Sequence, residues 1–190
     1  MYKSILYSLL KRKYNVTDST IKLLDCDLKV QEYIKGEDII RQGYIHKDIY
    51  FLIKGLAITY LTRDDKDYVT SFSSEGDVIF MPLRKVSLVT LTAIEDCIVL
   101  RMNYSKFEGL MGKHADIAIM GYKIFKRLLL LTTEDFFSFT GLDATDIYER
   151  VVKEKPEVVN RVPLKYIASK IGVTPSSLSR IRSAAFKHKK

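Results

Sequence analysis

Cysteine is scarce in this chain of 190 residues, which contains only Cys26 and Cys97. Two cysteines are too few for a disulfide framework, and an iron–sulfur cluster would need four cysteine ligands. The three histidines, His46, His114 and His188, are expected in a turn, at a helix start and in a basic tail. No spacing typical of a zinc site, a Ser–His–Asp triad or paired catalytic carboxylates occurs. The sequence therefore predicts no enzyme, no metal site and no cofactor.

Long apolar segments are also missing. The longest near the middle of the chain, residues 128–131, lies between Arg127 and Thr132. It is far shorter than the roughly 20 residues that cross a bilayer. At the N-terminus the charges follow the apolar residues and no small-residue cleavage site is found, so no signal peptide is predicted. We expect a soluble, cytoplasmic protein that does not enter a membrane.

Acidic residues are absent after Glu157. The chain has 31 Lys+Arg and 23 Asp+Glu, a net charge of +8, and eight of the basic residues lie between 161 and 190. Residues 1–160 are therefore neutral overall. A basic excess confined to one segment is typical of a protein that binds a polyanion. A basic tail lying on a membrane is the alternative, and the lack of a bulky apolar face disfavours it.

Residues 162–183 have the pattern of two short helices joined by a tight turn. Gly172 is expected to end the first helix, because glycine accepts the left-handed backbone that a sharp turn needs. Thr174 is a good N-cap, and Pro175 suits the first position of a second helix running to about residue 185. The first helix would have one apolar face: Leu164, Ile167, Ala168 and Ile171. This pattern predicts a helix-turn-helix.

The outward face of the second helix is short, polar and basic when its residues are placed at about 100° each. An arginine there can contact a guanine edge, and hydroxyls can contact bases or phosphates. The candidate DNA contacts are Lys165, Thr174, Ser176, Ser177, Ser179, Arg180, Ser183 and Lys187. An ordinary helical hairpin with a solvated polar face is the alternative, which the local charge disfavours.

The first half of the chain has a different pattern. Short helices are expected at 2–12 and 17–25. Between about 29 and 103, short β-branched and aromatic runs alternate with glycine turns, which predicts a compact barrel or roll. The expected strands are 33–34, 38–41, 49–53, 57–62, 68–72, 78–81, 88–93 and 98–102.

Particular residues in this region resemble a known domain. Gly36 followed by Glu37, then Gly43, the run 50–53 and Gly55 resemble the first half of the cyclic-nucleotide-binding β-roll. Together with the C-terminal segment RVPLKYIASKIGVTPSSLSRIR, they make the chain resemble the CRP/FNR family of bacterial transcription regulators. The C-terminal segment is especially similar to versions from Bacteroidetes-type bacteria. The resemblance spans nearly the whole chain.

This resemblance implies an α+β fold in three parts. Residues 1–111 would form a double-stranded β-helix or β-roll with N-terminal helices. Residues 112–140 would form a dimerisation helix and hinge, and residues 141–190 a winged helix-turn-helix domain. The implied function is a DNA-binding transcription regulator that acts as a homodimer on a palindromic site. The alternative is a stand-alone ligand-binding or protein-interaction module, and RNA polymerase stays open as a further partner.

The roll departs from the family members that bind cyclic AMP. Those members carry a Phe-Gly-Glu helix and then an Arg-Ser pair on the cyclic phosphate. Here Phe-Gly-Glu is missing and the phosphate segment shrinks to residues 81–87. Arg84, Ser87 and Phe80 are the remaining candidates for effector contacts. We expect neither cyclic AMP nor cyclic GMP to bind, so the effector is apolar, of unknown type, or absent.

Residues 112–139 are predicted to form the longest helix, and its apolar residues cover more than one face. One side should pack on the roll, and a near-heptad seam should meet a symmetry mate. Burial within one chain is the alternative explanation. The predicted seam consists of Ile117, Met120, Ile124, Leu128 and Leu131.

Overall fold

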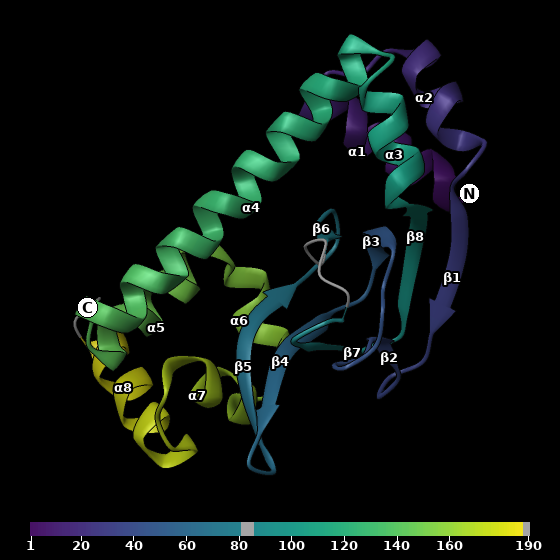
Figure 1. Ribbon diagram of the computed structural model, residues 1–190. Coiled ribbons are helices and arrows are strands. Elements are labelled where there is room, and N and C mark those ends of the chain that lie inside the picture. The colour runs from purple at the N-terminus through teal and green to yellow at the C-terminus, as the bar shows by residue number, and fades with distance from the viewer. Residues whose placement is uncertain (81–85, 188–190) are drawn as a thin grey trace.

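The computed structural model describes residues 1–80 and 86–187. A long helix, α4 (Ala115–Gly141), runs past a β-roll from the N-terminal helices to a group of helices at the C-terminal end (Figure 1). The described residues contain no helix that is both long and apolar enough to cross a bilayer.

The roll consists of two four-stranded antiparallel sheets with the strand orders β1-β8-β3-β6 and β2-β7-β4-β5. The first sheet packs on the N-terminal helices and α4, and the second packs on the C-terminal helices. The strands are β1 (Lys29–Tyr33), β2 (Asp38–Ile40), β3 (Asp48–Lys54), β4 (Ala57–Arg63), β5 (Lys66–Ser73), β6 (Val78–Phe80), β7 (Thr90–Ala93) and β8 (Cys97–Asn103).

Strand β3 shows why this region is so apolar. Its side chains alternate between the two faces of the sheet, as in any strand. Tyr50 and Leu52 lie in the interior of the roll, whereas Ile49, Phe51 and Ile53 pack in the cluster that includes α1 and α4. Both faces of the sheet are therefore buried at β3, and this strand is a continuous apolar run rather than an alternation of apolar and polar residues.

Three helices complete the N-terminal part: α1 (Tyr2–Tyr14), α2 (Asp18–Asp25) and α3 (Tyr104–Met111). Thr17 caps α2 by accepting a hydrogen bond from the Thr20 N–H, and Asn103 caps α3 in the same way. The sequence predicted α1 and α2 but missed α3, because its eight residues follow a strand without a break. The first strand was placed too late, since β1 begins at Lys29.

The C-terminal helices are α5 (Ala144–Glu154), α6 (Pro156–Arg161), α7 (Leu164–Ile171) and α8 (Pro175–Lys187). As predicted, Gly172 ends α7 in the left-handed conformation with φ 75°, and Thr174 accepts a hydrogen bond from the Ser177 N–H at the start of α8. All described strands precede residue 104, so the strands that would form the wing of the predicted winged helix-turn-helix are not found between residues 104 and 187. That detail of the predicted fold class is wrong for this range.

The predicted dimer seam on α4 needs correction. Ile117, Met120 and Ile124 are at most 1% exposed and belong to the protomer's own core with α1, α3 and the first sheet. Leu128 packs against the same cluster, and Leu131 is half-buried beside it. The near-heptad pattern on this face serves packing within one chain, because a long helix beside a sheet also needs an apolar stripe.

Gly55 has a strict requirement for glycine. Its φ is +97°, and a Cβ there would lie 2.5 Å from the Asp96 carbonyl oxygen and 2.7 Å from the Cys97 sulfur. Gly36 has a similar φ of +95° but nothing within 4 Å of an added Cβ. A side chain at Gly36 would therefore introduce backbone strain alone, whereas one at Gly55 would introduce both strain and steric overlap.

We expect Gly36→Ala to cost about 1 kcal/mol of unfolding free energy, from backbone strain alone. Gly55→Ala should cost about 2–4 kcal/mol, since overlap adds to strain. Urea denaturation of both variants measures the difference. Equal losses at the two positions would contradict the close packing around Gly55.

Candidate nucleic-acid interface and the contacts that orient it

Helix α8 presents a polar, exposed face. Leu178 is fully buried against α7, and Ile181 is half-buried on the same side. On the opposite side, Ser176, Ser179 and Arg180 are exposed, as is Ser183. The helix-turn-helix geometry thus leaves the predicted readout residues accessible to a partner.

The serines on this face are held in defined positions. The Ser179 hydroxyl donates to the Pro175 carbonyl, and the Ser183 hydroxyl donates to the Ser179 carbonyl, both at 3.0 Å. Thr174 Oγ1 lies 2.9 Å from the Ser176 hydroxyl and 3.0 Å from that of Ser177. A hydroxyl that donates to its own helix still has lone pairs, so it can accept from a base amino group.

The basic residues divide into two groups. Lys165 and Arg180 are exposed, and the Lys165 ammonium lies 4.7 Å from the centre of the Tyr166 ring. Lys187 is the last residue of α8, and its side chain is not described. In contrast, Arg161 and Lys170 are directed at the roll of the same chain, as described below. Part of the C-terminal basic excess is therefore used within the protein.

The C-terminal helices are docked on the roll through a shared apolar cluster. Leu56, Ile58 and Phe72 come from the outer face of the second sheet and its flanking turn. They pack in one buried cluster with residues of α5 to α8, among them Val158 and Ile167, which are fully buried. The core of the helix-turn-helix region and the outer layer of the roll are thus continuous.

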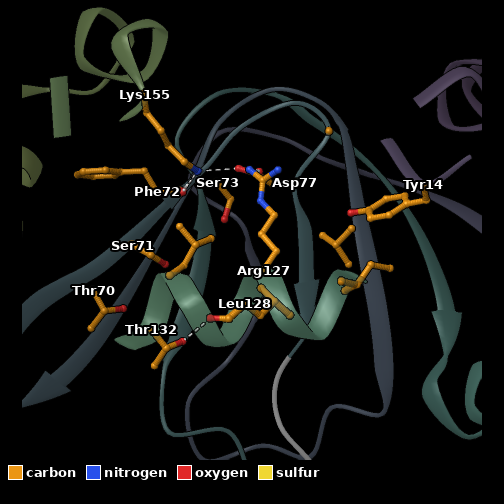
Figure 2. A pocket seen from close by; sticks show the side chains of 14 residues that line it. Tyr14, Thr70, Ser71, Phe72, Ser73, Asp77, Arg127, Leu128, Thr132 and Lys155 are labelled. Carbon is orange, nitrogen blue, oxygen red and sulfur yellow. Dashed lines mark hydrogen bonds and ion pairs between the residues drawn. The ribbon is translucent and has the colours of Figure 1, made fainter. Parts of the chain in front are cut away.

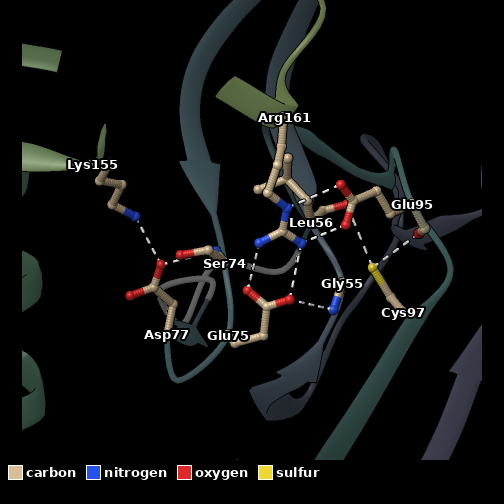
Figure 3. Close-up of polar contacts among 9 residues, drawn as sticks. All are labelled: Gly55, Leu56, Ser74, Glu75, Asp77, Glu95, Cys97, Lys155 and Arg161. Carbon is tan, nitrogen blue, oxygen red and sulfur yellow. Dashed lines mark hydrogen bonds and ion pairs between the residues drawn. The ribbon is translucent and has the colours of Figure 1, made fainter. Parts of the chain in front are cut away.

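An arginine closes this interface (Figure 3). Arg161, the last residue of α6, forms a bidentate contact with Glu75 at 2.8 and 2.9 Å and also pairs with Glu95. The Glu75 carboxylate in addition accepts from the Gly55 N–H at 2.9 Å. Bidentate arginine–carboxylate pairs fix orientation as well as distance, so they set how the helices sit on the sheet.

The ion pair shifts the titration of its members. Burial alone would raise the pKa of Glu75, but Arg161 and the Gly55 N–H outweigh it and hold that pKa below its ordinary value. A carboxyl with a lowered pKa stabilises the folded arrangement above its unfolded pKa, and this contribution is lost as the pH falls through the lowered value. The docked arrangement is therefore favoured at neutral pH.

Further polar contacts join the two parts. Lys170 of α7 donates a hydrogen bond from its ammonium group to the Thr70 carbonyl of β5. Ser169 of α7 accepts from the Val69 N–H and donates to the Asp67 carbonyl, both at 3.1 Å. These bonds satisfy the free edge of β5, which would otherwise expose unpaired backbone groups. Sequence reasoning missed this set, because a basic residue in a helix-turn-helix is normally assigned to the nucleic acid.

A second exposed face lies on α4, opposite its buried one. At about 100° per residue, its direction differs from that of the buried face by about 160°. The spacing alternates between three and four residues, which is the heptad spacing of a helix that packs on a second helix. The residues of this seam are Ile119, Tyr122, Lys126, Leu129, Thr133 and Phe136, all exposed.

The predicted effector residues are not brought together. Phe80 stacks with Tyr104 and Phe125 at centroid distances of 4.5 and 5.4 Å. Ser87 is buried and exchanges hydrogen bonds with the backbone of Val89. Arg84 lies outside the described residues. A cavity of about 340 Å³ is instead found between β5, the following turn and α4, and neither Phe80 nor Ser87 lines it.

The described residues provide neither a clustered metal site nor a reactive buried cysteine. They contain no group of three or more His, Cys, Asp and Glu side chains arranged for a metal ion. Burial raises the pKa of the Cys97 thiol to about 11. Since the thiolate is the reactive form, Cys97 is a poor nucleophile at neutral pH.

The contribution of Arg161 can be measured directly. Arg161→Gln removes the charge that pairs with two carboxylates. We therefore expect the free energy of unfolding to fall by about 1–3 kcal/mol. The Val69 N–H, which is bonded to Ser169, should then exchange faster with deuterium. Lys153→Gln, an exposed position on α5, is the matched control and should leave both quantities unchanged. Unaltered exchange in Arg161→Gln would show that the apolar cluster alone holds the interface.

Known proteins share this architecture. The family model of the cyclic nucleotide-binding domain matches residues 30–114. No curated protein matches the chain in sequence. Among solved structures, the c-di-GMP-responsive global regulator CLP from Xanthomonas campestris is 19% identical, with 91% of this chain and 93% of that chain covered and a TM-score of 0.69.

Two further structures agree. FixK2 from Bradyrhizobium japonicum is 20% identical over 85% of this chain and 86% of that chain, with a TM-score of 0.71. A mutant of CooA from Carboxydothermus hydrogenoformans is 17% identical over 95% of this chain and 84% of that chain, with a TM-score of 0.74. At such identities the likeness concerns the fold, and it confirms the predicted architecture of roll, long helix and C-terminal helices. Residues 30–114 thus match the model of the cyclic nucleotide-binding domain, and the chain as a whole shares the fold of the CRP/FNR family regulators to which it is similar.

Proposed function

We propose that the protein is a transcription regulator that binds a specific DNA sequence as a homodimer. The observation that carries this proposal is the exposed polar face of α8, which is held outward by the docking of α7 and α6 on the roll. A recognition helix must be both accessible and rigidly placed to enter the major groove. The regulatory role named for the similar protein CLP, which links cell–cell signalling to virulence gene expression, supports the same class of function.

In this proposal the side chains of α8 have different tasks. Arg180 lies at the middle of the exposed face and reads a guanine edge, for which its planar fork is suited. Ser176 and Ser183 contact bases or phosphates, and Ser177 and Thr174 lie at the helix start, where free N–H groups attract a phosphate. Lys165 on α7 contacts the backbone of the DNA.

The dimer is proposed to form through the seam of α4. Ile119, Tyr122, Leu129 and Phe136 are between 52% and 68% exposed, which is unusual for four large apolar side chains on one helix. A symmetric pair of such helices would bury them against each other. The two copies of α8 would then bind the two halves of a palindromic site whose centres lie about 34 Å apart.

The α8 assignment is tested by comparing two substitutions. Arg180→Ala should weaken binding to the preferred site by about 1–3 kcal/mol and spare random DNA, as expected for a base contact. Lys165→Ala should weaken binding to the preferred site and to random DNA alike. It should also reduce the slope of the logarithm of the binding constant against the logarithm of the salt concentration by about one. Fluorescence anisotropy against a site selected from genomic fragments measures both effects. If no fragment is bound specifically, the stand-alone ligand-binding or interaction module becomes the better explanation.

The seam is tested by Leu129→Asp. Placing a carboxylate in a buried helix pair is costly, so this variant should sediment as a folded monomer. Its affinity for the full palindrome should fall strongly, because the two half-sites no longer bind jointly. Lys123→Asp, on an exposed flank of the same helix, should stay dimeric. A dimeric Leu129→Asp would place the interface on another surface.

Cyclic nucleotides are expected not to bind. Neither Phe80 nor Ser87 lines the cavity, and the part of the roll that the structure describes shows no cluster of preorganised donors of the kind that a buried cyclic phosphate needs. Thermal unfolding with millimolar cyclic AMP or cyclic GMP should therefore show no shift. A ligand at about 100 times its dissociation constant would add about 2.7 kcal/mol and raise the midpoint by several degrees. A shift of that size would contradict the expectation.

A further inference from the structure

Helices α4 and α5 meet at a corner but belong to different parts of the core. Figure 1 shows α5 behind the end of α4, turning back from there toward α6. The residues of α4 that belong to a buried cluster pack with α1 and the first sheet, and Leu128 is the last described one along the helix. Ile147 and Tyr148 of α5 are instead buried in the cluster that contains the second sheet. Among the described residues, no shared apolar cluster therefore fixes the angle between α4 and α5.

Arg150 joins the two helices through polar contacts. Its guanidinium donates from Nη1 to the Glu134 carbonyl and from Nη2 to the Glu134 carboxylate, both at 2.9 Å. Its Nε donates to the carboxylate of Glu154, one turn further along α5, at 2.6 Å. All three nitrogens of the planar guanidinium are thus engaged. Such a contact fixes orientation as well as distance.

This contact lies away from the corner itself. Helix α4 ends at Gly141, and α5 begins at Ala144. Since each helical residue rises 1.5 Å, Glu134 lies about 10 Å before the end of α4 and Arg150 about 9 Å past the start of α5. A contact at that distance from the corner restricts the angle between the helices, whereas a contact at the corner would leave it free.

A second contact relates α5 to α4 through the roll. Figure 2 shows Lys155 and Arg127 converging on Asp77, in the turn before β6. The ammonium of Lys155, the C-cap residue of α5, lies 2.7 Å from one carboxylate oxygen of Asp77, and the guanidinium of Arg127 on α4 lies 3.5 Å from the other. Arg127 is about 10 Å from Glu134 along α4. Helix α5 is therefore related to α4 at two separate points, which together define the direction of its axis.

The Arg150 contact is too accessible to add much stability. The side chain of Arg150 is 25% exposed and that of Glu134 is 50% exposed. Water and salt screen an ion pair of this kind, so it contributes little to the free energy of unfolding. Its geometric role can therefore be measured in variants that remain folded.

The docking on the roll does not replace this contact. Docking fixes α6 and α7 relative to the second sheet, and the first sheet holds α4 as far as Leu128. The seam continues beyond that point with Leu129, Thr133 and Phe136, which are exposed and lie outside the described buried clusters. Glu134 lies in the same stretch of α4. Arg150 thus connects the end of the seam with the helices that carry α8.

We propose that Arg150 is a positioning residue that sets the spacing of the two half-sites the protein recognises. The proposal rests on the proposed function, in which two copies meet along the α4 seam and each α8 binds one half-site. The angle between α4 and α5 then contributes to the separation and the relative orientation of the two recognition helices. When Arg150 is lost, that angle varies more widely, and the dimer accepts sites with other spacings.

The test on DNA varies the distance between half-sites. One base pair inserted at or removed from the centre of the palindrome changes the separation by about 3.4 Å and the relative rotation by about 35°. Wild-type protein should lose about tenfold or more in affinity on each altered site, because its two α8 helices no longer fit both half-sites together. Fluorescence anisotropy with the selected palindrome, the two altered palindromes and a single half-site measures this preference.

Arg150→Gln should change the preference for spacing rather than the recognition of bases. We expect its affinity for the original palindrome to fall by about three- to tenfold and to differ by less than about threefold among the three spacings. Its affinity for the single half-site should equal that of the wild type, since the exposed face of α8 is unaltered. A loss of fold or of base recognition would lower the half-site affinity as well, so this comparison separates positioning from a structural effect.

Two further variants serve as comparisons. Arg150→Lys keeps the positive charge but offers a single ammonium group, so we expect it to behave like Arg150→Gln. Lys153→Gln removes a positive charge from an exposed position of the same helix and should keep the wild-type preference. Thermal unfolding of each variant establishes that it is folded. A wild-type preference for spacing in Arg150→Lys would contradict the role given to the planar guanidinium.

A distance measurement tests the same contact without DNA. Spin labels are attached at Leu130→Cys on α4 and Ala184→Cys on α8, two exposed positions outside the seam. Cys26→Ser removes the exposed native thiol, and Cys97 stays because it is only 1% exposed. Dilution with unlabelled protein restricts the measured distances to single protomers, so neither the dimer nor DNA is required. Pulsed electron paramagnetic resonance then gives the distribution of the distance between α4 and α8.

The two measurements decide the proposal separately from the proposed function. We expect a narrow distribution in the parent protein and in Lys153→Gln, and a broader one in Arg150→Gln. Equal widths in all three, or an unchanged preference for spacing in Arg150→Gln, would overturn the proposal and assign the spacing to the docking on the roll. If the wild type binds no specific site, the proposed function fails, whereas the distance distributions still decide whether Arg150 positions α8.

Discussion

The structure depends on the docking of α6 and α7 on the outer face of the second sheet. The apolar cluster is continuous across this contact, and Arg161 fixes its direction by pairing with Glu75 and Glu95 together. Hydrophobic contacts alone are not directional, whereas a bidentate ion pair permits one orientation. The position of α8 relative to the roll follows from this combination, since α8 packs on α7.

Helix α4 connects the parts because its faces have different tasks. One face is buried in the protomer, with Ile117 and Met120 in the core next to Phe107. The opposite face is exposed and has heptad spacing. Arg127 lies between these faces and lines the cavity together with Leu128 of the buried face. The same helix therefore contributes to the core of the protomer, to the cavity and to the exposed seam.

Much of the fold could be predicted from the sequence. Glycine turns and β-branched runs located most strands, and Gly172 with Thr174 fixed the turn of the helix-turn-helix, because these signals are local. The faces of α4 could not be assigned, since an apolar residue that packs on its own sheet and one that packs on a partner look alike in sequence. For that reason Ile124 was predicted to lie in a dimer interface, whereas it packs in the core of its own protomer. The docking roles of Arg161 and Lys170 depend on residues about 70–100 positions away, so no local signal pointed to them.

The seam on α4 is imperfect, because Lys126 and Thr133 occupy positions that apolar residues fill in a strong coiled coil. Lysine at such a position lowers stability, although its ammonium lies 5.9 Å from the centre of the Tyr122 ring. A weak helix pair leaves monomers present at low protein concentration. If the protein is the dimeric regulator proposed above, occupancy of a two-fold operator then rises with the square of that concentration, so a modest change in its expression would produce a disproportionate change at its target genes.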